Sequence, residues 1–579
     1  MINLKINNIP VSVEEGTTIL QAAKKIGIRI PTLCYMKEIN AIGACRVCVV
    51  EVKGARSLVA ACVYPVNEGM EVFTDTPKVR ESRKTTIELI LSDHNKSCLS
   101  CDRNTHCELQ DLAYEYGCNA VKYEGEHHEC EKDFSTPYLV RDNSKCVLCR
   151  RCIAVCRKIQ EVGVIGPIKR GFKTIVGCAF ESELNDSPCV ACGQCINVCP
   201  TGALHEREEI DVVRAAIADP EKIVIAGPAP SVRAGLGEEF GYPMGTNVEG
   251  KMVTALRMLG FDKIFDVNFT ADLTIMEEAH ELIERVKNGG ALPMFTSCSP
   301  GWVRYLEYYY PELIPNVSSC KSPQQMFGAI CKTYYAEKMG IDPSKIFVVS
   351  IMPCTAKKFE KTRGNQNASG YPDIDAVLTT RELAKMIKQN GILFNEIPEG
   401  EMDQPLGVYT GAGVIFGATG GVMEAALRTA AETITGQTLD NVEYKKVRGT
   451  KGIKEATYEV GGLKLKVAVA SGIANAKKVC EKVASGKSDH TFIEIMCCPG
   501  GCVNGGGQPI MSSVVRENVD YKALRASALY KADKKAEYRK SHDNPVIKEL
   551  YENYLGEPGS HKAHEILHTT YVARERYKK

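Results

Sequence analysis

The sequence of 579 residues lacks an excess of charge of either sign, with 72 basic and 71 acidic residues. A net charge of +1 gives no reason to expect nucleic acid or an anionic membrane surface as the main partner. Long apolar runs are missing as well, since no stretch approaches the roughly 18 apolar residues of a membrane span. The first residues, MINLKINNIPVSV, carry no basic segment followed by an apolar core. We therefore expect no membrane span and a cytoplasmic location.

Nucleotide-binding motifs are also missing. No G-x-G-x-x-G follows a strand-like run, and no phosphate-binding P-loop is present. A nicotinamide or flavin site is therefore expected on another chain. Tryptophan occurs once, as Trp302 in the motif TSCSPGW.

Cysteine, in contrast, is abundant: the chain has 26, more than half of them between residues 34 and 199. Their grouping as CxxC clusters in a long chain favours metal ligation over disulfides. The most specific pattern is C-x2-C-x2-C-x3-C, which occurs twice and is typical of two-cluster bacterial ferredoxins, where the fourth cysteine of each run binds the other cluster. Zinc would instead favour tetrahedral CxxC pairs. Crossed ligation predicts two 4Fe-4S clusters, one held by Cys146, Cys149, Cys152 and Cys199 and the other by Cys189, Cys192, Cys195 and Cys156.

Two further ligand sets lie upstream. The first has a spacing that suggests a 2Fe-2S cluster, although it departs from the plant-type pattern and structural zinc is the alternative. The second offers three thiolates and one imidazole, which fits a third accessory 4Fe-4S cluster or a zinc site, and its position between other clusters favours iron. The first set is Cys34, Cys45, Cys48 and Cys62, and the second is His94, Cys98, Cys101 and Cys107.

The pattern of strands and helices predicts a multidomain α+β and α/β protein. Residues 2–13 alternate apolar and polar side chains around Asn7-Asn8, as in a β-hairpin, and TTILQAAKKIG follows as a short helix. Apolar strand-like runs such as KIVIAG and KIFVVSIM appear after residue 210. We predict a 2Fe-2S ferredoxin-like domain of β-grasp type at 1–77, a His/Cys3 cluster domain at 78–137, a two-cluster ferredoxin domain at 138–209 and a large two-lobed α/β domain at 210–579.

The large C-terminal domain carries few cysteines, but in unusual contexts. They occur in TSCSPGW, MPCTAKKFE and EIMCCPGGCVNGGGQP, where glycines allow the backbone to approach a bulky group closely. Soft ligands from three distant loops could hold one more cluster, and the alternative is that Cys298 and Cys354 are small core residues.

These three motifs resemble, in the correct order, the signature motifs of the iron-only, or [FeFe], hydrogenases. The cysteine-rich front end is similar to that of the large clostridial members, and to the N-terminal part of the largest peripheral-arm subunit of respiratory complex I. The resemblance implies reversible conversion of protons and electrons to H2 at a six-iron H-cluster. This cofactor is a cubane joined to a two-iron subsite with carbonyl, cyanide and azadithiolate ligands, supplied with electrons by one 2Fe-2S and three 4Fe-4S clusters.

The resemblance also implies roles for single residues. Cys354, Cys498 and Cys502 match cubane ligands, with Cys502 bridging to the two-iron subsite. Cys298 matches the cysteine that passes protons to the bridgehead amine.

Ser299 departs from the family pattern, because the family usually has a cubane-ligating cysteine there. Either the serine oxygen binds iron, or Cys298 becomes the ligand, or the site is incompletely built. A cubane iron prefers thiolate to alkoxide, and Cys497 is a conceivable substitute thiol.

A buried metal that splits dihydrogen needs a line of exchangeable groups to water. Glu278 and Glu281 share one helical face, and with Ser318 and Cys298 they match the family's relay, which ends near Arg285. Without the resemblance, Glu278 and Glu281 would be interpreted as a solvated acidic face of the helix.

Other pocket residues follow from the resemblance alone. Lys357 matches a lysine that donates to a cyanide ligand, and its alternative is a solvated surface lysine. The resemblance implies a second cyanide contact at Ala229, Pro230 and Ser231. It also implies a pocket wall formed by Gln324, Met352, Phe416 and Met496.

The electron partner is either ferredoxin, for a stand-alone enzyme, or the flavoprotein, NAD-binding and small iron-sulfur subunits of an electron-bifurcating complex. The complex I-like front end and the TSCSPGW variant favour the complex. A hydrogen-sensing or electron-transfer subunit with an impaired site is the alternative function, against which the retained Cys298, Glu278, Glu281 and Lys357 argue. We expect packing roles for Cys118, Cys130, Cys178, Cys320, Cys331 and Cys480.

Overall fold

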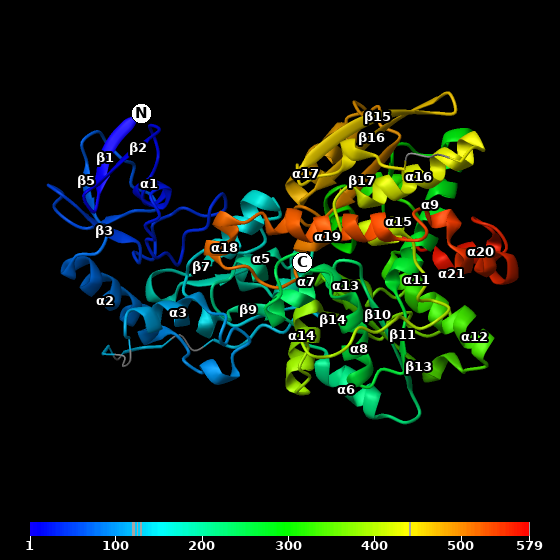
Figure 1. Ribbon diagram of the computed structural model, residues 1–579, viewed down its shortest axis with the longest axis horizontal. Coiled ribbons are helices and arrows are strands. Elements are labelled where there is room, and N and C mark those ends of the chain that lie inside the picture. The colour runs from blue at the N-terminus through cyan, green and yellow to red at the C-terminus, as the bar shows by residue number, and fades with distance from the viewer. Residues whose placement is uncertain (119–121, 124, 128–129, 439–441, 578–579) are drawn as a thin grey trace. The chain divides into compact units, whose positions relative to one another are not determined.

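The computed structural model describes residues 1–118, 122–123, 125–127, 130–438 and 442–577. The chain forms two compact units (Figure 1). The first comprises Met1–Ser187, Cys195–His205 and Ile510–Val519, and the second Pro188–Gln194, Glu206–Pro509 and Asp520–Lys579. Among the described residues, no helix has the length and apolar character that crossing a bilayer requires. The four predicted domain boundaries stay predictions.

The first unit begins with the predicted hairpin. Strands β1 (Ile2–Ile6) and β2 (Ile9–Val13) pair antiparallel, and the turn residues Asn7 and Asn8 have φ of 49° and 69°. Asparagine tolerates this left-handed conformation better than most residues. The predicted helix is α1 (Ile19–Lys25), which a capping box between Thr18 and Gln21 starts. The sheet has the order β2-β1-β5-β3-β4, with β3 at Val49–Val52, β4 at Val59–Ala60 and β5 at Glu71–Phe73.

The remainder of the first unit is mostly short helices and loops that carry cysteines. Helices α2 and α3 lie largely within the segment predicted to carry the His/Cys3 cluster, and β7 and β8 form a small hairpin. The bounds are α2 Pro77–Asp93, α3 Glu108–Glu115, β6 Leu139–Arg141, α4 Arg151–Ala154, β7 Gly166–Ile168, β8 Ile175–Gly177 and α18 Ser513–Asn518; α5 (Gln194–Val198) and β9 (Leu204–Glu206) each include a unit boundary.

The described part of the second unit contains two four-stranded sheets together with many helices, so it is of α/β type (Figure 1). One has the order β11-β10-β13-β14 and is entirely parallel. The other has the order β12-β17-β16-β15, in which only β15 and β16 pair antiparallel. The strands are β10 Ile223–Pro228, β11 Lys263–Ile264, β12 Met294–Phe295, β13 Ile346–Met352, β14 Ala376–Thr379, β15 Ile453–Val460, β16 Leu463–Ser471 and β17 Phe492–Met496.

Helix α9 (Val267–Asn288) is the longest helix of this unit, with 22 residues, and most of its side chains are buried. Asp266 caps its first turn and Gly289, at φ 78°, ends it. The other helices are α6 Ile210–Ala218, α7 Val232–Gly235, α8 Glu249–Met258, α10 Pro300–Tyr309, α11 Pro323–Ile330, α12 Ala336–Met339, α13 Ala356–Glu360, α14 Thr380–Gln389, α15 Gly411–Ile415, α16 Gly421–Thr435, α17 Ile473–Ala484, α19 Tyr521–Lys535, α20 Pro545–Leu550 and α21 His561–Leu567.

Candidate active site

A buried cavity in the second unit is lined by the loops that follow strands β10, β12, β13 and β17. Ligands of α/β proteins commonly bind beyond the carboxyl ends of parallel strands. The cavity volume is about 80 Å³, several times the ~15 Å³ that one water needs. Its lining brings together these residues from the sequence analysis: Ala229, Pro230, Ser231, Cys298, Ser299, Gln324, Met352, Cys354, Lys357, Phe416, Met496, Cys497, Cys498 and Cys502.

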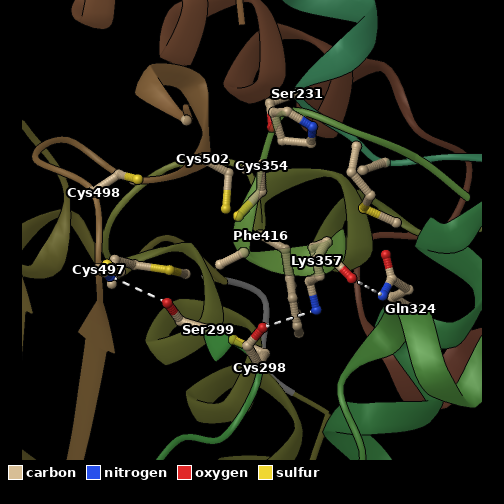
Figure 2. Close-up of a pocket in the computed structure, with 18 of the residues that line it drawn as sticks. Ser231, Cys298, Ser299, Gln324, Cys354, Lys357, Phe416, Cys497, Cys498 and Cys502 are labelled. Atoms are coloured by element: carbon tan, nitrogen blue, oxygen red, sulfur yellow. Dashed lines mark hydrogen bonds between the residues drawn. The ribbon is translucent and has the colours of Figure 1, made fainter. Parts of the chain in front are cut away.

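Three thiols gather on one side of this cavity. Cys354 follows β13, and Cys498 and Cys502 follow β17; Figure 2 shows the sulfur atoms of Cys354 and Cys502 pointing toward each other. Burial and the neighbouring sulfurs raise the pKa of Cys354, and burial and Cys498 raise the pKa of Cys502 to about 12. Thiolates in this place need a cation to offset their buried charge. The thiols here outnumber the ammonium and guanidinium groups that could neutralise their thiolates. Such a set of sulfur donors suits a soft metal.

The glycine-rich loop after Cys498 packs tightly against protein backbone. A Cβ on Gly505 would lie 2.1 Å from the carbonyl oxygen of Pro353, and a Cβ on Gly506 would lie 2.5 Å from that of Cys192. Gly501 adopts φ 96°, a left-handed conformation that favours glycine. The sequence predicts that these glycines admit a bulky group, and close contact between backbone segments is a second reason for them.

The motif TSCSPGW forms the turn from β12 into α10. Pro300 is the first residue of the helix and Ser299 precedes it. The Ser299 Oγ accepts a hydrogen bond from the backbone N–H of Cys497 at 3.1 Å (Figure 2). Trp302 is fully buried against Phe295 and donates its Nε1–H to the carbonyl of Thr296 at 3.2 Å. The tryptophan therefore anchors the turn, and the serine joins it to the loop after β17.

Cys497 is buried beside this turn. Its thiol is in hydrogen-bond contact with the Cys192 and Cys498 thiols, and these contacts together with burial raise its pKa. A Cβ on Gly301 would lie 2.7 Å from the Cys497 sulfur, so helix α10 needs glycine there. Cys497 therefore packs among other sulfur atoms rather than in an apolar core.

Lys357 is buried, with a side chain only 10% exposed. Its ammonium donates to the Cys298 carbonyl at 3.2 Å, the Ser322 hydroxyl at 2.8 Å and the Glu360 carboxylate at 2.9 Å. It is therefore not a solvated surface lysine. Sequence reasoning missed Ser322 and Glu360. The only available signal was the separation of three residues between Lys357 and Glu360, which places them on one face of α13.

Two buried polar atoms beside the cavity lack a hydrogen-bond partner among the described residues. They are Ser231 Oγ and Gln324 Oε1. The amide nitrogen of Gln324 is paired, since it donates to the Lys357 carbonyl at 3.3 Å and to Glu360 at 3.1 Å. A buried polar atom without a partner costs about 1–3 kcal/mol. Such atoms on both sides of one cavity indicate a polar ligand there.

Helix α9 presents Glu278 to the protein interior. Its side chain is fully buried, and Oε1 accepts hydrogen bonds from the backbone N–H and the hydroxyl of Ser297, each at 3.3 Å. Burial raises the pKa of Glu278 to about 8. Its charge in turn is the largest influence, after burial, that raises the pKa of Cys298. Glu278 is therefore not part of a solvated acidic face.

Glu281 lies one turn further along α9 and nearer the surface, with a side chain 16% exposed. It accepts hydrogen bonds from the Ser318 hydroxyl at 2.7 Å and from the Arg285 guanidinium at 2.6 Å. The Ser318 hydroxyl also lies close enough to Glu278 to lower its pKa. The structure thus brings Glu278, Ser318, Glu281 and Arg285 into one continuous polar row.

Comparison with known proteins identifies the family. Residues 222–506 match the family described as "Iron only hydrogenase large subunit, C-terminal domain", and residues 519–574 match "Iron hydrogenase small subunit". The NADP-reducing hydrogenase subunit HndD of Solidesulfovibrio fructosivorans is 48% identical over 588 residues, covering 100% of both chains. The chain belongs to the iron-only hydrogenases. This hydrogenase is also 47% identical to iron hydrogenase 1 of Clostridium pasteurianum, over 98% of this chain and 99% of that one.

A solved structure and the family matches of the cysteine-rich N-terminal segment agree with membership of the iron-only hydrogenases. The [FeFe]-hydrogenase HydA1 of Chlamydomonas reinhardtii is 44% identical, with a TM-score of 0.57, over 64% of this chain and 100% of that one. Residues 1–77 match a "2Fe-2S iron-sulfur cluster binding domain", residues 83–122 an "NADH-ubiquinone oxidoreductase-G iron-sulfur binding region", and residues 136–205 an "NADH-quinone oxidoreductase subunit 3, ferredoxin-like domain". The hydrogenase is therefore an oxidoreductase with iron-sulfur domains, and the expected family membership is confirmed.

Within the first unit of the hydrogenase, the four cysteines of the 2Fe-2S prediction come together. Cys34 and Cys45 are in hydrogen-bond contact, as are Cys48 and Cys62, and the two pairs are close enough to perturb each other. The contact with Cys34 lowers the pKa of Cys45 to about 6. Thiols that share protons in this way are suited to a shared metal centre.

The crossed ferredoxin set is also partly assembled in the first unit. Cys146, Cys149 and Cys152 line one cavity with Cys199, which comes from the second cysteine run. The complementary set includes residues of both units, so it stays a prediction.

The His/Cys3 set is only partly described: burial and the nearby Cys101 raise the pKa of Cys107, and His94 lines a separate cavity. Burial lowers the pKa of His94 to about 4, and its Nδ1 is buried without a partner among the described residues. The cavity that His94 lines includes Cys130 and Asp142, but none of the three predicted thiols among its described residues. This cluster stays a prediction as well. The predicted thiol ligands there are Cys98, Cys101 and Cys107.

Proposed function

We propose that this hydrogenase catalyses 2 H⁺ + 2 e⁻ ⇌ H₂ at a six-iron H-cluster bound in the cavity of the second unit. The observation that carries the proposal is that one cavity is lined by three thiols and by two buried polar atoms that have no hydrogen-bond partner among the described residues. When bound, the H-cluster supplies the redox chemistry of dihydrogen. The protein supplies ligands, proton transfer, electron transfer and the exclusion of water.

The residues around the cavity fit this cofactor. Cys354, Cys498 and Cys502 would hold the cubane, and Cys502 would also serve the two-iron subsite. Lys357 and Ser231 would donate to the cyanide ligands, and the lysine contact would be of the stronger, charge-assisted kind. Apolar wall residues exclude water and thereby strengthen these contacts. The wall is formed by Ala229, Pro230, Met352, Phe416 and Met496.

Ser299 provides the fourth cubane ligand in this proposal. Its oxygen accepts the Cys497 N–H, and such a bond stabilises negative charge on a ligand oxygen. Cys298 then remains available as a proton carrier, in keeping with its electrostatic contact with Glu278.

Protons pass between the cavity and solvent along α9. Cys298 exchanges a proton with Glu278, whose pKa of about 8 lies close to the working pH and suits a group that must both bind and release protons. Ser318 takes a proton from Glu278 and gives its own to Glu281, with which it is hydrogen-bonded. Arg285 holds the Glu281 carboxylate near the surface.

The predicted 2Fe-2S cluster and the three predicted accessory 4Fe-4S clusters would supply electron transfer to the cavity. The relative HndD is named as a subunit of an NADP-reducing hydrogenase. We infer that this chain also works with flavoprotein, NAD-binding and small iron-sulfur subunits, in a cytoplasmic, electron-bifurcating complex that exchanges electrons with ferredoxin too. Anaerobic co-purification of a flavoprotein, with H2-dependent reduction of NAD(P), is the expected result. A chain that purifies alone and reacts only with ferredoxin would contradict the complex.

The catalytic proposal is tested on protein matured with the two-iron subsite. We expect H2-dependent reduction of a viologen dye, together with infrared bands from carbonyl and cyanide ligands. A protein that shows these bands without turnover would instead be a hydrogen sensor, the function that the unusual Ser299 favours as second candidate.

A further inference from the structure

A histidine from the C-terminal segment lies directly beside the proposed proton relay. The backbone of residues 567–569 pairs with that of residues 319–321: Lys321 N–H donates to Leu567, and Thr569 N–H donates to Ser319, both at 2.8 Å. This pairing places His568 next to the loop that carries Ser318, and therefore next to Glu281.

Both ring nitrogens of His568 are hydrogen-bonded. Nδ1 is bonded to the Ser319 hydroxyl at 2.8 Å, and Nε2 to the Glu277 carboxylate at 3.0 Å. The His568 side chain is 5% exposed and Glu277 is fully buried. Glu277 also accepts hydrogen bonds from the Tyr551 hydroxyl and from the N–H of Gly559. Partners on both ring nitrogens therefore fix the orientation of the imidazole.

The same imidazole lies within reach of the relay carboxylate. One oxygen of Glu281, the sulfur of Cys320 and one ring nitrogen of His568 all lie within 4.8 Å of one another. Ser319, which is bonded to His568, also donates its backbone N–H to Glu281 at 3.1 Å. A metal ion could use these three side chains, but the imidazole nitrogens are already paired and burial raises the pKa of the Cys320 thiol. The arrangement therefore suits proton transfer better than metal binding.

A route to solvent continues from His568. Its ring stacks on that of His564 in α21, with centroids 4.2 Å apart and planes inclined by 8°. His564 is exposed. The two stacked rings of His568 and His564 therefore connect the buried relay residues with the protein surface.

We propose that His568 is a second outlet for protons from the relay, parallel to the outlet at Arg285. This inference rests on the proposed relay through Glu278 and Glu281. In the outward direction, Glu281 loses the proton of its carboxyl group to the ring nitrogen of His568 that lies within 4.8 Å of its oxygen. A carboxylate and an imidazolium result, and the imidazolium releases its proton to water beside His564. No electron is transferred, and H2 evolution uses the reverse sequence.

Titratable groups from several elements face His568. They are Glu277 and Glu281 of α9 and the stacked His564 of α21. Tyr551 and Cys320 also face this row and are neutral at working pH, since burial raises the pKa of both.

A double-mutant cycle on the matured enzyme tests the second outlet. The variants are His568→Gln, Arg285→Gln and the pair together, with His561→Gln as the matched control, because His561 is an exposed histidine at the start of α21, the helix that ends just before His568. Parallel outlets compensate for each other, so we expect each single variant to lose turnover by only a few-fold and the double variant to lose about 100-fold, within the range of positioned proton transfer. A double variant that loses no more than the product of the two single losses would overturn the proposal.

Two further measurements separate a proton outlet from a structural role. Added imidazole should restore turnover of His568→Ala but not of Glu281→Ala. In protein without the H-cluster, the pH dependence of the Glu281 carboxyl infrared band should shift in His568→Gln and stay unchanged in His561→Gln. Absence of both effects would mean that His568 only holds the C-terminal segment in place. If Glu278→Gln retained full turnover, the proposed relay would be wrong. An additive double-mutant cycle would instead contradict only the second outlet at His568.

Discussion

Ser299 stands where the family resemblance leads us to expect a cubane-ligating cysteine. Its hydroxyl is tied to the loop after β17 through the Cys497 N–H, whereas the Cys497 thiol faces Cys192 and Cys498. Hydrogen bonding therefore separates two residues that sequence reasoning treats as competing ligands.

Variants at these positions test which residue binds the cubane. We expect Ser299→Ala to lose cubane iron, because only three protein ligands would remain, and Ser299→Cys to retain it, because iron prefers thiolate. Cys497→Ala should retain it too. Iron content and electron paramagnetic resonance of protein without the two-iron subsite are the measurements. Iron loss in Cys497→Ala, with none in Ser299→Ala, would transfer the ligand role to Cys497.

Protonation of Glu278 makes the stability of the folded protein depend on pH. Burial raises its pKa to about 8 from an ordinary value of 4.5, so between these pH values the folded chain holds a proton that the unfolded chain has released. The contribution of Glu278 to the free energy of unfolding therefore falls as pH rises from about 4.5 to about 8, by roughly 1.4 kcal/mol for each unit of pKa difference.

We expect Glu278→Gln to remove this fall while lowering turnover by about 100-fold or more. Urea unfolding at several pH values and hydrogen oxidation assays are the measurements. Glu284→Gln, at an exposed position of the same helix, is the control and should change neither. An unchanged pH dependence of stability in Glu278→Gln would mean that Glu278 is ionised in the folded protein.

At the scale of elements, the site depends on loops that follow strands and on helices that begin beside it. The turn from β12 into α10 is anchored by Trp302, and the loop after β17 lies on backbone atoms of residues 353 and 192. These loops contribute the predicted ligands, so their close packing sets ligand positions.

Gly505→Ala tests this packing. Its Cβ would lie 2.1 Å from the Pro353 carbonyl oxygen, so the loop must shift, and we expect a loss of about 1–3 kcal/mol in stability together with weaker cluster binding. The control is Gly364→Ala, where a Cβ would meet no atom within 4 Å. Thermal unfolding and iron content are the measurements. Equal behaviour of the two variants would show that the loop has room to move.

At the scale of the molecule, the cysteine runs connect distant segments. Cys199 lines the same cavity as the first run of cysteines, 47 to 53 positions earlier in the chain. Crossed ligation therefore predicts that Cys199→Ser and Cys149→Ser perturb the same 4Fe-4S signal, whereas Cys192→Ser perturbs a different one. Redox-titrated electron paramagnetic resonance distinguishes the signals. A shared phenotype of Cys199→Ser and Cys192→Ser would support uncrossed ligation.

The C-terminal segment is the other long-range contribution. It matches the iron hydrogenase small subunit over residues 519–574, and His568 within it meets Ser319 from 249 positions earlier. The proposed second outlet therefore needs this segment in addition to the large-subunit domain.

The sequence by itself determined the metal-binding class, the family and much of the local structure. Three thiols of a ferredoxin run come from one tight loop, and the hairpin at residues 2–13 needs only alternation and a turn, so both are local features that spacing reveals. Motif order also revealed which side chains line the cavity, because the family resemblance carries that information.

Only the tertiary structure decided which of these groups are buried, paired or left without partners. The raised pKa of Glu278, the unpaired Ser231 hydroxyl, the three acceptors around Lys357 and the contacts of His568 all depend on segments that are remote in the sequence. Burial and hydrogen bonding are properties of a packed environment, and neither residue type nor spacing specifies which distant atoms supply it.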